Sequence, residues 1–267
     1  MEEPLVKTSV DGRVGIITFN RPNSLNAFNV KLIEETNLAV QKFTKDERIH
    51  CIIVNGNGRA FSAGFDMKES AQRDITTKEE WRKVLEEDFD FIMQFWHCKK
   101  PTIAAVHGYC IGGAFELLMA CDLAVGANST LFGEPEVKFG SGIVALLAPW
   151  VTSPKQAKEL LLTGNDKVSA QRCYEMGILN KISNDGEQLN DALELANQIV
   201  SAASKSVQMT KSAINRTYEL SQMKESLLHG LEVDIQIESD LSPERVEFNR
   251  IRKNDGLKAA LNWRDKT

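Results

Sequence analysis

Apolar side chains follow two different patterns along the first two thirds of the chain. The runs at 14–20 (VGIITFN) and 49–58 (IHCIIVNGNG) are rich in Val and Ile and end in turn residues, which predicts strands. Residues 30–43 and 77–100 instead space their apolar side chains along one face of a helix. Strands that alternate with helices predict an α/β domain with much parallel strand pairing.

A further strand is predicted at 101–108 (PTIAAVHG), followed by a buried helix and another strand within 113–125 (GAFELLMACDLAV). In such domains ligands bind beyond the carboxyl ends of the strands, where turns lead into helix N-termini. The segments 61–67 (FSAGFDM) and 108–116 (GYCIGGAFE) both occupy this position. We therefore expect two strand ends to converge on one site.

The last part of the chain is polar, helical and poor in strand signals. One helix is predicted to begin at Ser242-Pro243, a good N-cap followed by proline at the first helical position. The apolar side chains of these helices need a partner surface. We predict a core of residues 1–195 that carries the site, and a helical oligomerisation region of residues 196–267.

Composition narrows the function classes for this chain of 267 residues. The net charge of −5 provides no electrostatic footprint for nucleic acid, and no apolar run is long enough to span a membrane. The five cysteines form no CxxC pair and the four histidines show no ligand spacing, so we expect no metal site. With no visible signal peptide, this cysteine usage indicates a reducing, cytoplasmic location.

Two glycine turns offer backbone donors. Gly112-Gly113 is predicted to open a helix directly after a strand, where N–H groups are unsatisfied and a ligand can approach closely. Such a donor suits an oxygen that becomes negative during a reaction. Phe65, which follows Gly64 in the other turn, could supply a second donor. Taken alone, each segment is also a common tight turn.

Two glutamates lie close to these turns in the sequence. Glu116 follows Gly113 by less than one helical turn, and Glu136 follows Pro135, which stiffens the local backbone. Two carboxylates beside one ligand can divide acid and base work. The alternative for either glutamate is a solvated surface charge, the usual fate of Glu. Other carboxylates that could be mistaken for site residues are Glu134, Asp66 and Asp122.

The motifs FNRPNSLNAF, GNGRAFSAGFDMKE, KKPTIAAVHGYCIGGAFELLMACDLAVGANSTLFGEPEVKFG and AKELLLTGN occur in this order. Together they resemble the enoyl-CoA hydratase/isomerase (crotonase) superfamily over nearly the whole chain. The resemblance implies an α/β, crotonase-like spiral of ββα units with a C-terminal α-helical trimerisation region. It implies acyl-CoA thioester substrates, a homotrimer or dimer of trimers, and no cofactor, since coenzyme A is part of the substrate.

The resemblance also implies roles for individual residues. Phe65 and Gly113 match the two oxyanion-hole donors, and Glu116 and Glu136 fill both acidic positions of the hydratases. This favours addition of water to a 2-enoyl-CoA, or dehydration of the 3-hydroxyacyl-CoA. The substrate-binding residues that it implies are Leu25, Ala27, Ala63, Gly64, Asp66, Met67, Gly112, Pro135 and Gly140. Candidates for contacts with the coenzyme A phosphates are Lys253, Lys258 and Arg264.

One segment departs from the family pattern. Familiar hydratases carry a Gly-rich run with an Arg after the second glutamate, whereas Ser141–Trp150 here reads SGIVALLAPW. Because this segment should line or back the acyl pocket, the acyl group could be branched, aromatic or dicarboxylic. Other enzymes of the superfamily, an isomerase or a retro-aldol lyase, remain alternatives. A non-catalytic binding module would instead predict lost carboxylates or a blocked oxyanion hole.

Overall fold

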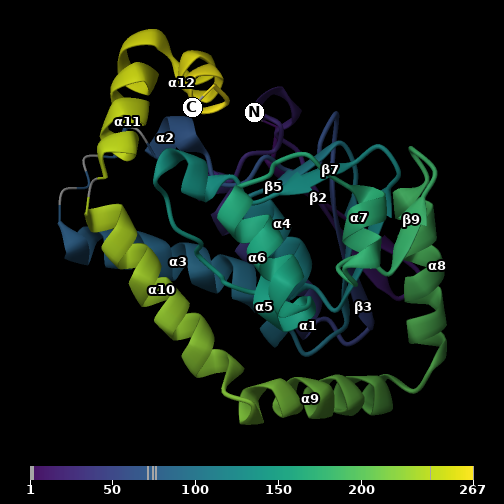
Figure 1. Cartoon of the computed structure of the whole chain (residues 1–267). Coiled ribbons are helices and arrows are strands. Elements are labelled where there is room, and N and C mark those ends of the chain that lie inside the picture. Colours follow the sequence, from purple (N-terminus) through teal and green to yellow (C-terminus); the bar gives the residue numbers. More distant parts are fainter. Residues whose placement is uncertain (1–2, 71, 74, 76, 241, 267) are drawn as a thin grey trace.

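The computed structural model describes residues 3–70, 72–73, 75, 77–240 and 242–266, and Figure 1 shows its helices wrapped around a twisted sheet. The strands of this sheet, in spatial order, are β1 (Val6–Asp11), β2 (Val14–Phe19), β3 (Cys51–Gly56), β4 (Thr102–Val106), β6 (Leu123–Ala127) and β9 (Lys181–Ser183). The β1–β2 pair is an antiparallel hairpin and every other neighbouring pair is parallel. A smaller sheet contains β5 (Tyr109–Ile111), β7 (Leu131–Gly133) and β8 (Val168–Ser169). The predicted α/β class with much parallel pairing is confirmed.

Both faces of the larger sheet are covered, which explains why its central strands are almost continuously apolar. Val14 and Ile16 of β2 pack toward α8 (Gln188–Ser201), whereas Ile17 and Phe19 point into the main core. That main core is filled from α1 (Val30–Lys45), α3 (Lys78–His97) and α4 (Gly113–Ala120). The alternation along β2 follows from the two-residue period of a strand.

The predicted helices at 30–43 and 77–100 are confirmed to within a few residues. The Asn29 side chain caps α1 by accepting the Leu32 N–H at 3.0 Å. Thr77 and Glu80 form a capping box at the start of α3. The remaining helices before α8 are η1 (Pro22–Ser24), α2 (Met67–Ser70), η2 (Glu136–Phe139), α5 (Ala148–Val151), α6 (Pro154–Thr163) and α7 (Ala170–Glu175). In the part of the chain that the structure describes, no helix has the length and apolar character needed to cross a membrane.

The predicted division at residues 195/196 falls inside α8. Ala192 and Ala196, on either side of this division, both pack on the sheet. As a packing unit, the C-terminal helical region begins at α9 (Ser204–Leu220). Lys211 ties α9 to the core by donating to the Asp122 carboxylate at 2.6 Å. The Thr102 N–H donates to the same Asp122 oxygen at 2.7 Å. Asp122 is therefore a structural anchor.

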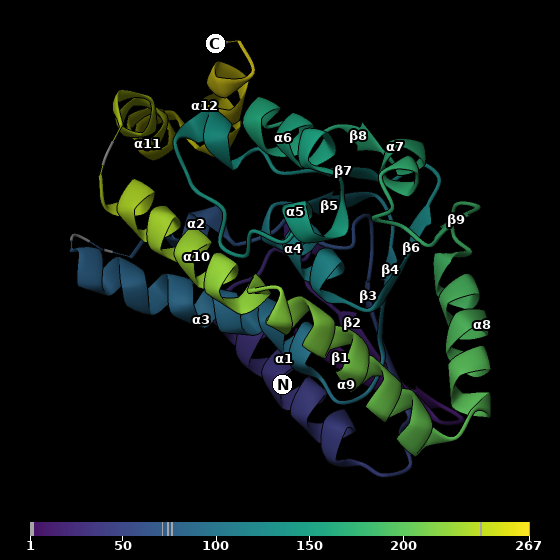
Figure 2. The same ribbon diagram turned by 60° about the horizontal axis from the view of Figure 1, so that its bottom comes forward.

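The last three helices return to the core of the same chain. α10 (Met223–Ser239) runs beside α3 in both views (Figures 1 and 2). α11 (Pro243–Asp255) and α12 (Leu257–Arg264) cluster around Met67 and Phe139, and the rings of Phe139 and Phe248 stack 5.1 Å apart. These helices therefore bury part of their apolar surface within one chain. The predicted oligomeric role of the region stays a prediction.

Candidate active site

The loop after β2 has an unusual backbone that places one wall of the site. Leu25 and Asn26 adopt the left-handed conformation, with φ of 49° and 52°. The Asn26 side chain holds this shape by donating to the carbonyl oxygens of Asn57 and Ala60, each at 2.8 Å. The Leu25 carbonyl then accepts the Ala63 N–H at 3.0 Å. Two of the predicted substrate-binding segments are thus in direct contact.

The turn at Gly64 leaves the Phe65 N–H without a backbone acceptor in the described part of the chain. Phe28 forms a short parallel bridge with this segment: its N–H donates to the Gly64 carbonyl at 2.8 Å and its carbonyl accepts the Asp66 N–H at 3.0 Å. In this geometry the Phe65 N–H points away from Phe28. Among the described residues it has no backbone acceptor.

The second donor turn lies against the first. The Gly112 N–H donates to the Gly133 carbonyl at 2.8 Å, whereas the Gly113 N–H, at the start of α4, has no backbone acceptor within the described ranges. A Cβ atom on Gly64 would lie 3.3 Å from the Gly113 nitrogen, so the two turns touch. The Phe65 ring covers Gly113 so closely that a Cβ atom there would lie 2.3 Å from the ring and would displace it. Two adjacent N–H groups without backbone acceptors form a geometry that can bind an oxyanion.

Glu116 lies in the first turn of α4 and is fully buried. It is 1% exposed, and its Oε2 atom accepts the Ala145 N–H at 2.5 Å. Burial raises the pKa of this carboxyl well above its usual value, and the negative charge of Glu136 raises it further. The Ala145 N–H partly offsets both effects because it favours the charged form.

Glu136 approaches the same place from the other side. It opens the short helix η2, and its Oε1 atom occupies the space that a Cβ atom on Gly112 would need. Its Oε2 atom is buried and has no hydrogen-bond partner among the described residues. Burial raises the pKa of Glu136 to about 7, although its own backbone N–H favours the charged form.

The two glutamates therefore flank the glycine turn as a coupled pair, with Glu116 fully buried and Glu136 half-buried. Such a pair titrates as a unit, and burial favours the protonated form of each carboxyl. One carboxyl can then give a proton while the other accepts one. This arrangement supports acid–base chemistry on a ligand whose oxygen binds between Phe65 and Gly113. Within the described ranges, no three His, Cys, Asp or Glu side chains are grouped as metal ligands would be.

Glu134, which could be mistaken for a site residue from its sequence position, lies in the protein interior. It is 0% exposed, and neither carboxyl oxygen has a partner in the described part of the chain. Burial is the main cause that raises its pKa well above the usual value, and the charges of Glu136 and Glu116 raise the pKa further. The sequence does not predict the burial of Glu134, because this burial depends on the tertiary packing of β7 and Pro135.

Unfolding stability is expected to fall as the pH rises from about 5 to about 8. The folded-state pKa of Glu136, about 7, exceeds its ordinary 4.5, so its contribution is complete below 4.5 and lost as the pH rises through 7. This amounts to about 3 kcal/mol for Glu136. Urea unfolding at both pH values should show a smaller fall for Glu136→Gln than for the parent. An equal fall in both proteins would contradict the assignment.

Two of the predicted ligand contacts are taken up by the protein itself. The Asp66 carboxylate pairs with Arg21 and accepts the Lys68 N–H at 2.9 Å, so it caps α2. Arg264 is 8% exposed and pairs with Asp166 at 2.8 Å. Arg264 is therefore a structural residue, not a phosphate contact, because its charge is buried against the core.

The other predicted residues lie around the glutamates or on the C-terminal helices. Pro135 immediately precedes Glu136 and is buried. The carbonyl groups of Met67 and Gly140 accept hydrogen bonds from α11, from Arg252 at 3.3 Å and from Arg245 at 3.1 Å. Ala27 is half-buried beside Leu25. Lys253 and Lys258 are exposed, and their phosphate-binding role stays a prediction.

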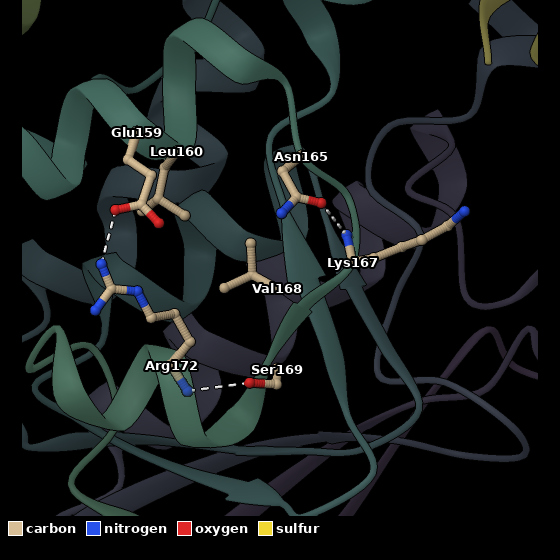
Figure 3. Close-up of a pocket in the computed structure, with 7 residues that line it drawn as sticks. All are labelled: Glu159, Leu160, Asn165, Lys167, Val168, Ser169 and Arg172. Atoms are coloured by element: carbon tan, nitrogen blue, oxygen red, sulfur yellow. Dashed lines mark hydrogen bonds and ion pairs between the residues drawn. The ribbon is translucent and has the colours of Figure 1, made fainter. Parts of the chain in front are cut away.

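A surface pocket of about 240 Å³ lies elsewhere, between α6, β8 and α7 (Figure 3). Glu159 and Arg172 form an ion pair of 2.7 Å at its wall. Asn165 and Lys167 line another side and are joined through the Lys167 N–H. The pocket shares no lining residue with the glycine turns or the two glutamates. It is therefore separate from the candidate site.

The family model described as enoyl-CoA hydratase/isomerase matches residues 10–242. The chain belongs to this family. A curated relative from Dictyostelium discoideum, named probable enoyl-CoA hydratase, mitochondrial, is 37% identical over 80% of this chain and 76% of its own length. A short-chain-enoyl-CoA hydratase from Clostridium acetobutylicum is 33% identical over 77% of this chain and 79% of its own length.

The fold of this hydratase/isomerase family member matches solved structures closely. An enoyl-CoA hydratase/isomerase from Xanthobacter autotrophicus Py2 is 41% identical and superimposes with a TM-score of 0.96, covering 98% of this chain and 97% of that one. An enoyl-CoA hydratase from Mycobacterium smegmatis, 24% identical, superimposes with a TM-score of 0.90 and supports the fold alone. The predicted crotonase-like fold with C-terminal helices is confirmed.

Proposed function

We propose that this protein is an enoyl-CoA hydratase, which adds water reversibly to the double bond of a 2-enoyl-CoA thioester. The observation that carries the proposal is the convergence on the Gly112-Gly113 turn of two carboxyls, that of the buried Glu116 and that of the half-buried Glu136, whose Oε2 atom is inaccessible to solvent. A non-catalytic module would not need two buried carboxyl groups of like charge, because each is costly to desolvate. The names of the curated relatives support the same activity.

The backbone donors stabilise the charge that develops during the reaction. In the proposed complex the thioester oxygen accepts the Phe65 and Gly113 N–H groups. Addition at the β-carbon moves negative charge onto this oxygen as an enolate. Donors fixed in advance bind that charge better than the neutral carbonyl, and each contributes about 3 kcal/mol to the transition state. Phe65 provides its backbone N–H as a donor despite its bulky side chain, and its ring covers the start of α4.

The glutamates carry the proton transfers. Water bound between them attacks the β-carbon as Glu116 accepts its proton, while protonated Glu136 delivers a proton to the α-carbon. Dehydration follows the same steps in reverse. The raised pKa of Glu136, about 7, supports its role as an acid at neutral pH. The Ala145 N–H orients the Glu116 carboxyl and favours its charged form, which opposes the larger effects of burial and of the Glu136 charge.

Further properties belong to the same proposal. Coenzyme A is part of the substrate, so no separate cofactor is required, and the exposed Lys253 and Lys258 contact its phosphates in the proposed complex. The loop at Leu25 and the facing turn at Ala63 hold the pantetheine chain. We also propose a homotrimer or dimer of trimers in the cytoplasm. All five cysteines are free and buried, which fits a reducing compartment.

Product analysis tests the proposed activity. The protein is incubated with 2-enoyl-CoA esters of several chain lengths and the products are identified by mass and retention time. The proposal expects the corresponding 3-hydroxyacyl-CoA. A shifted double bond without added water would indicate an isomerase, and chain cleavage of a 3-hydroxyacyl-CoA would indicate a retro-aldol lyase. Either product in place of the hydrated one would overturn the assignment.

A further inference from the structure

Glu134 is a buried carboxyl that the proposed mechanism does not use. It directly follows β7, and the last residue of that strand, Gly133, accepts the Gly112 N–H at 2.8 Å. Glu134 therefore leaves the strand beside the same glycine turn that Glu116 and Glu136 flank. Its side chain is 0% exposed. A carboxyl that is buried so completely is stable only with a hydrogen-bond partner or with a proton of its own.

Glu134 and Glu136 share an unmet need for a hydrogen bond. Three buried carboxyl oxygens of the two residues have no partner among the described residues: both of Glu134 and the Oε2 atom of Glu136. Only Pro135 separates the two glutamates, and its backbone turns at φ of −83° and ψ of 2°, which shortens the path between them relative to an extended strand. Two ionised carboxylates only accept, so the pair needs one proton to form a bond.

The surroundings of the pair decide which carboxyl keeps that proton. Burial raises the pKa of Glu134 well above its usual value, and the charges of Glu136 and Glu116 raise it further. A bond donated by Glu134 acts in the same direction on its own pKa and lowers the pKa of Glu136. The other titratable or charged groups that face the pair are Cys110 on β5, Asp166 before β8 and Arg264 on α12. The Arg264 charge favours the ionised form of Glu136, so Glu134 is the carboxyl that stays protonated.

We propose that Glu134 is a positioning residue for Glu136: its carboxyl group keeps a proton and donates a hydrogen bond to the Oε2 atom of Glu136. The inference rests on the proposed hydratase function. When Glu136 gives its own proton to the α-carbon, Glu134 keeps the proton that it holds. The bond between them then has an ionised acceptor, which makes it stronger. An interaction that strengthens as the reaction proceeds lowers the barrier.

Substitutions that keep or remove the donor test this role. Glu134→Gln keeps an N–H donor, whereas Glu134→Met and Glu134→Leu remove it and place an apolar side chain in the protein interior. We expect kcat for hydration to stay within about threefold of the parent in Glu134→Gln and to fall about ten- to a hundredfold in the other two, with little change in KM. Circular dichroism identifies which of the two apolar variants is folded. Glu225→Met, at an exposed position of α10, is the control and should keep parental kcat.

The pH dependence of kcat separates this role from a merely structural one. Loss of the donor raises the pKa of Glu136, so the alkaline limb of hydration should move about one unit higher in Glu134→Met and stay in place in Glu134→Gln. If Glu134 were ionised, removing its charge would lower the pKa of Glu136 and move the limb downward in both variants. That result, or a parental kcat and pH profile in the folded apolar variants, would overturn the inference.

Infrared spectroscopy tests the hydrogen bond without turnover, so it also applies if no enoyl-CoA is hydrated. The carbonyl stretch of a protonated carboxyl is separate from the bands of a carboxylate. At about pH 8, where Glu136 with its pKa of about 7 is mostly ionised, the difference between the parent and Glu134→Gln should contain one protonated-carboxyl band. A difference with carboxylate bands alone would overturn the inference. The expected band in a protein that hydrates no enoyl-CoA would support the bond and refute only the proposed activity.

Discussion

Replacing Glu136 with Gln is expected to lower kcat for enoyl-CoA hydration by on the order of 10²–10⁴-fold while the protein stays folded. The amide keeps the size of the side chain but cannot deliver a proton to the α-carbon. Folding should not suffer, because the carboxyl is buried and its pKa is raised to about 7. Steady-state kinetics on the best substrate of the chain-length series, with thermal unfolding in parallel, would measure both effects.

Glu116→Gln is expected to cause a loss of similar size, because the attacking water then lacks a base. The two glutamates act as one unit, so the kcat of the double variant should be only slightly lower than the kcat of the less active single variant. Glu225→Gln, an exposed glutamate on α10, provides the matched control and should retain parental kcat. Near-parental hydration by both folded single variants would refute the two-carboxylate mechanism.

Gly112→Ala is the second change with a large expected effect. Gly112 has φ of 58° and ψ of −133°, a conformation that a residue with a Cβ atom rarely adopts, and the new methyl group would overlap Glu136 Oε1. We expect about 1–3 kcal/mol of lost stability from backbone strain. The displaced carboxyl should cost a further ~10²-fold in kcat, because proton transfer depends closely on position. Urea unfolding and steady-state kinetics would measure the two effects separately.

Gly12→Ala is the control that separates the effect of backbone strain from the effect of displacing the Glu136 carboxyl. Gly12 has φ of 54° in the β1–β2 hairpin, and a Cβ atom there would meet nothing within 4 Å. This control should lose about 1–2 kcal/mol of stability but no kcat. If Gly112→Ala retained full kcat with a similar loss of stability, the contact between Gly112 and Glu136 would not matter for catalysis.

The parts of the site that could be predicted from sequence are local. Gly113 and Glu116 belong to one strand–turn–helix unit, so their proximity follows from helix geometry. Phe65 occupies the same position in a second unit, and parallel strands bring their carboxyl ends to one edge. Glu136 is less local, because its place beside Gly112 depends on the packing of β7 against β5.

The parts that could not be predicted depend on which surfaces meet. Leu227, Leu231 and Ile235 mark a buried stripe on α10, and Asp234 falls within it. That pattern indicates a buried carboxyl, but it does not reveal that Gly230, Asp234 and Glu238 lie against residues 141–146. Arg264 has the same difficulty: a cation near the end of a helix indicates exposure until a partner such as Asp166 is known.

The C-terminal helices illustrate a related limit. Their apolar side chains predict a partner surface, and the pattern is the same whether that surface belongs to the same chain or to another. Phe248 stacks on Phe139 within the chain, next to Gly140 and the catalytic segment. The helices therefore pack against the segment that follows Glu136, and substitutions in α11 beside Gly140 should affect substrate choice.

Isotope incorporation tests the central claim most directly. The protein would convert its best 2-enoyl-CoA substrate in water labelled with heavy oxygen, and separately in deuterated water, and the product would be analysed by mass spectrometry and NMR. Hydration by the two glutamates predicts heavy oxygen at the β-carbon and one solvent-derived deuterium at the α-carbon, and Glu116→Gln and Glu136→Gln should form this labelled product about 10²–10⁴-fold more slowly. A product with deuterium but no heavy oxygen, or a parental rate of labelled-product formation in the two folded variants, would contradict the account.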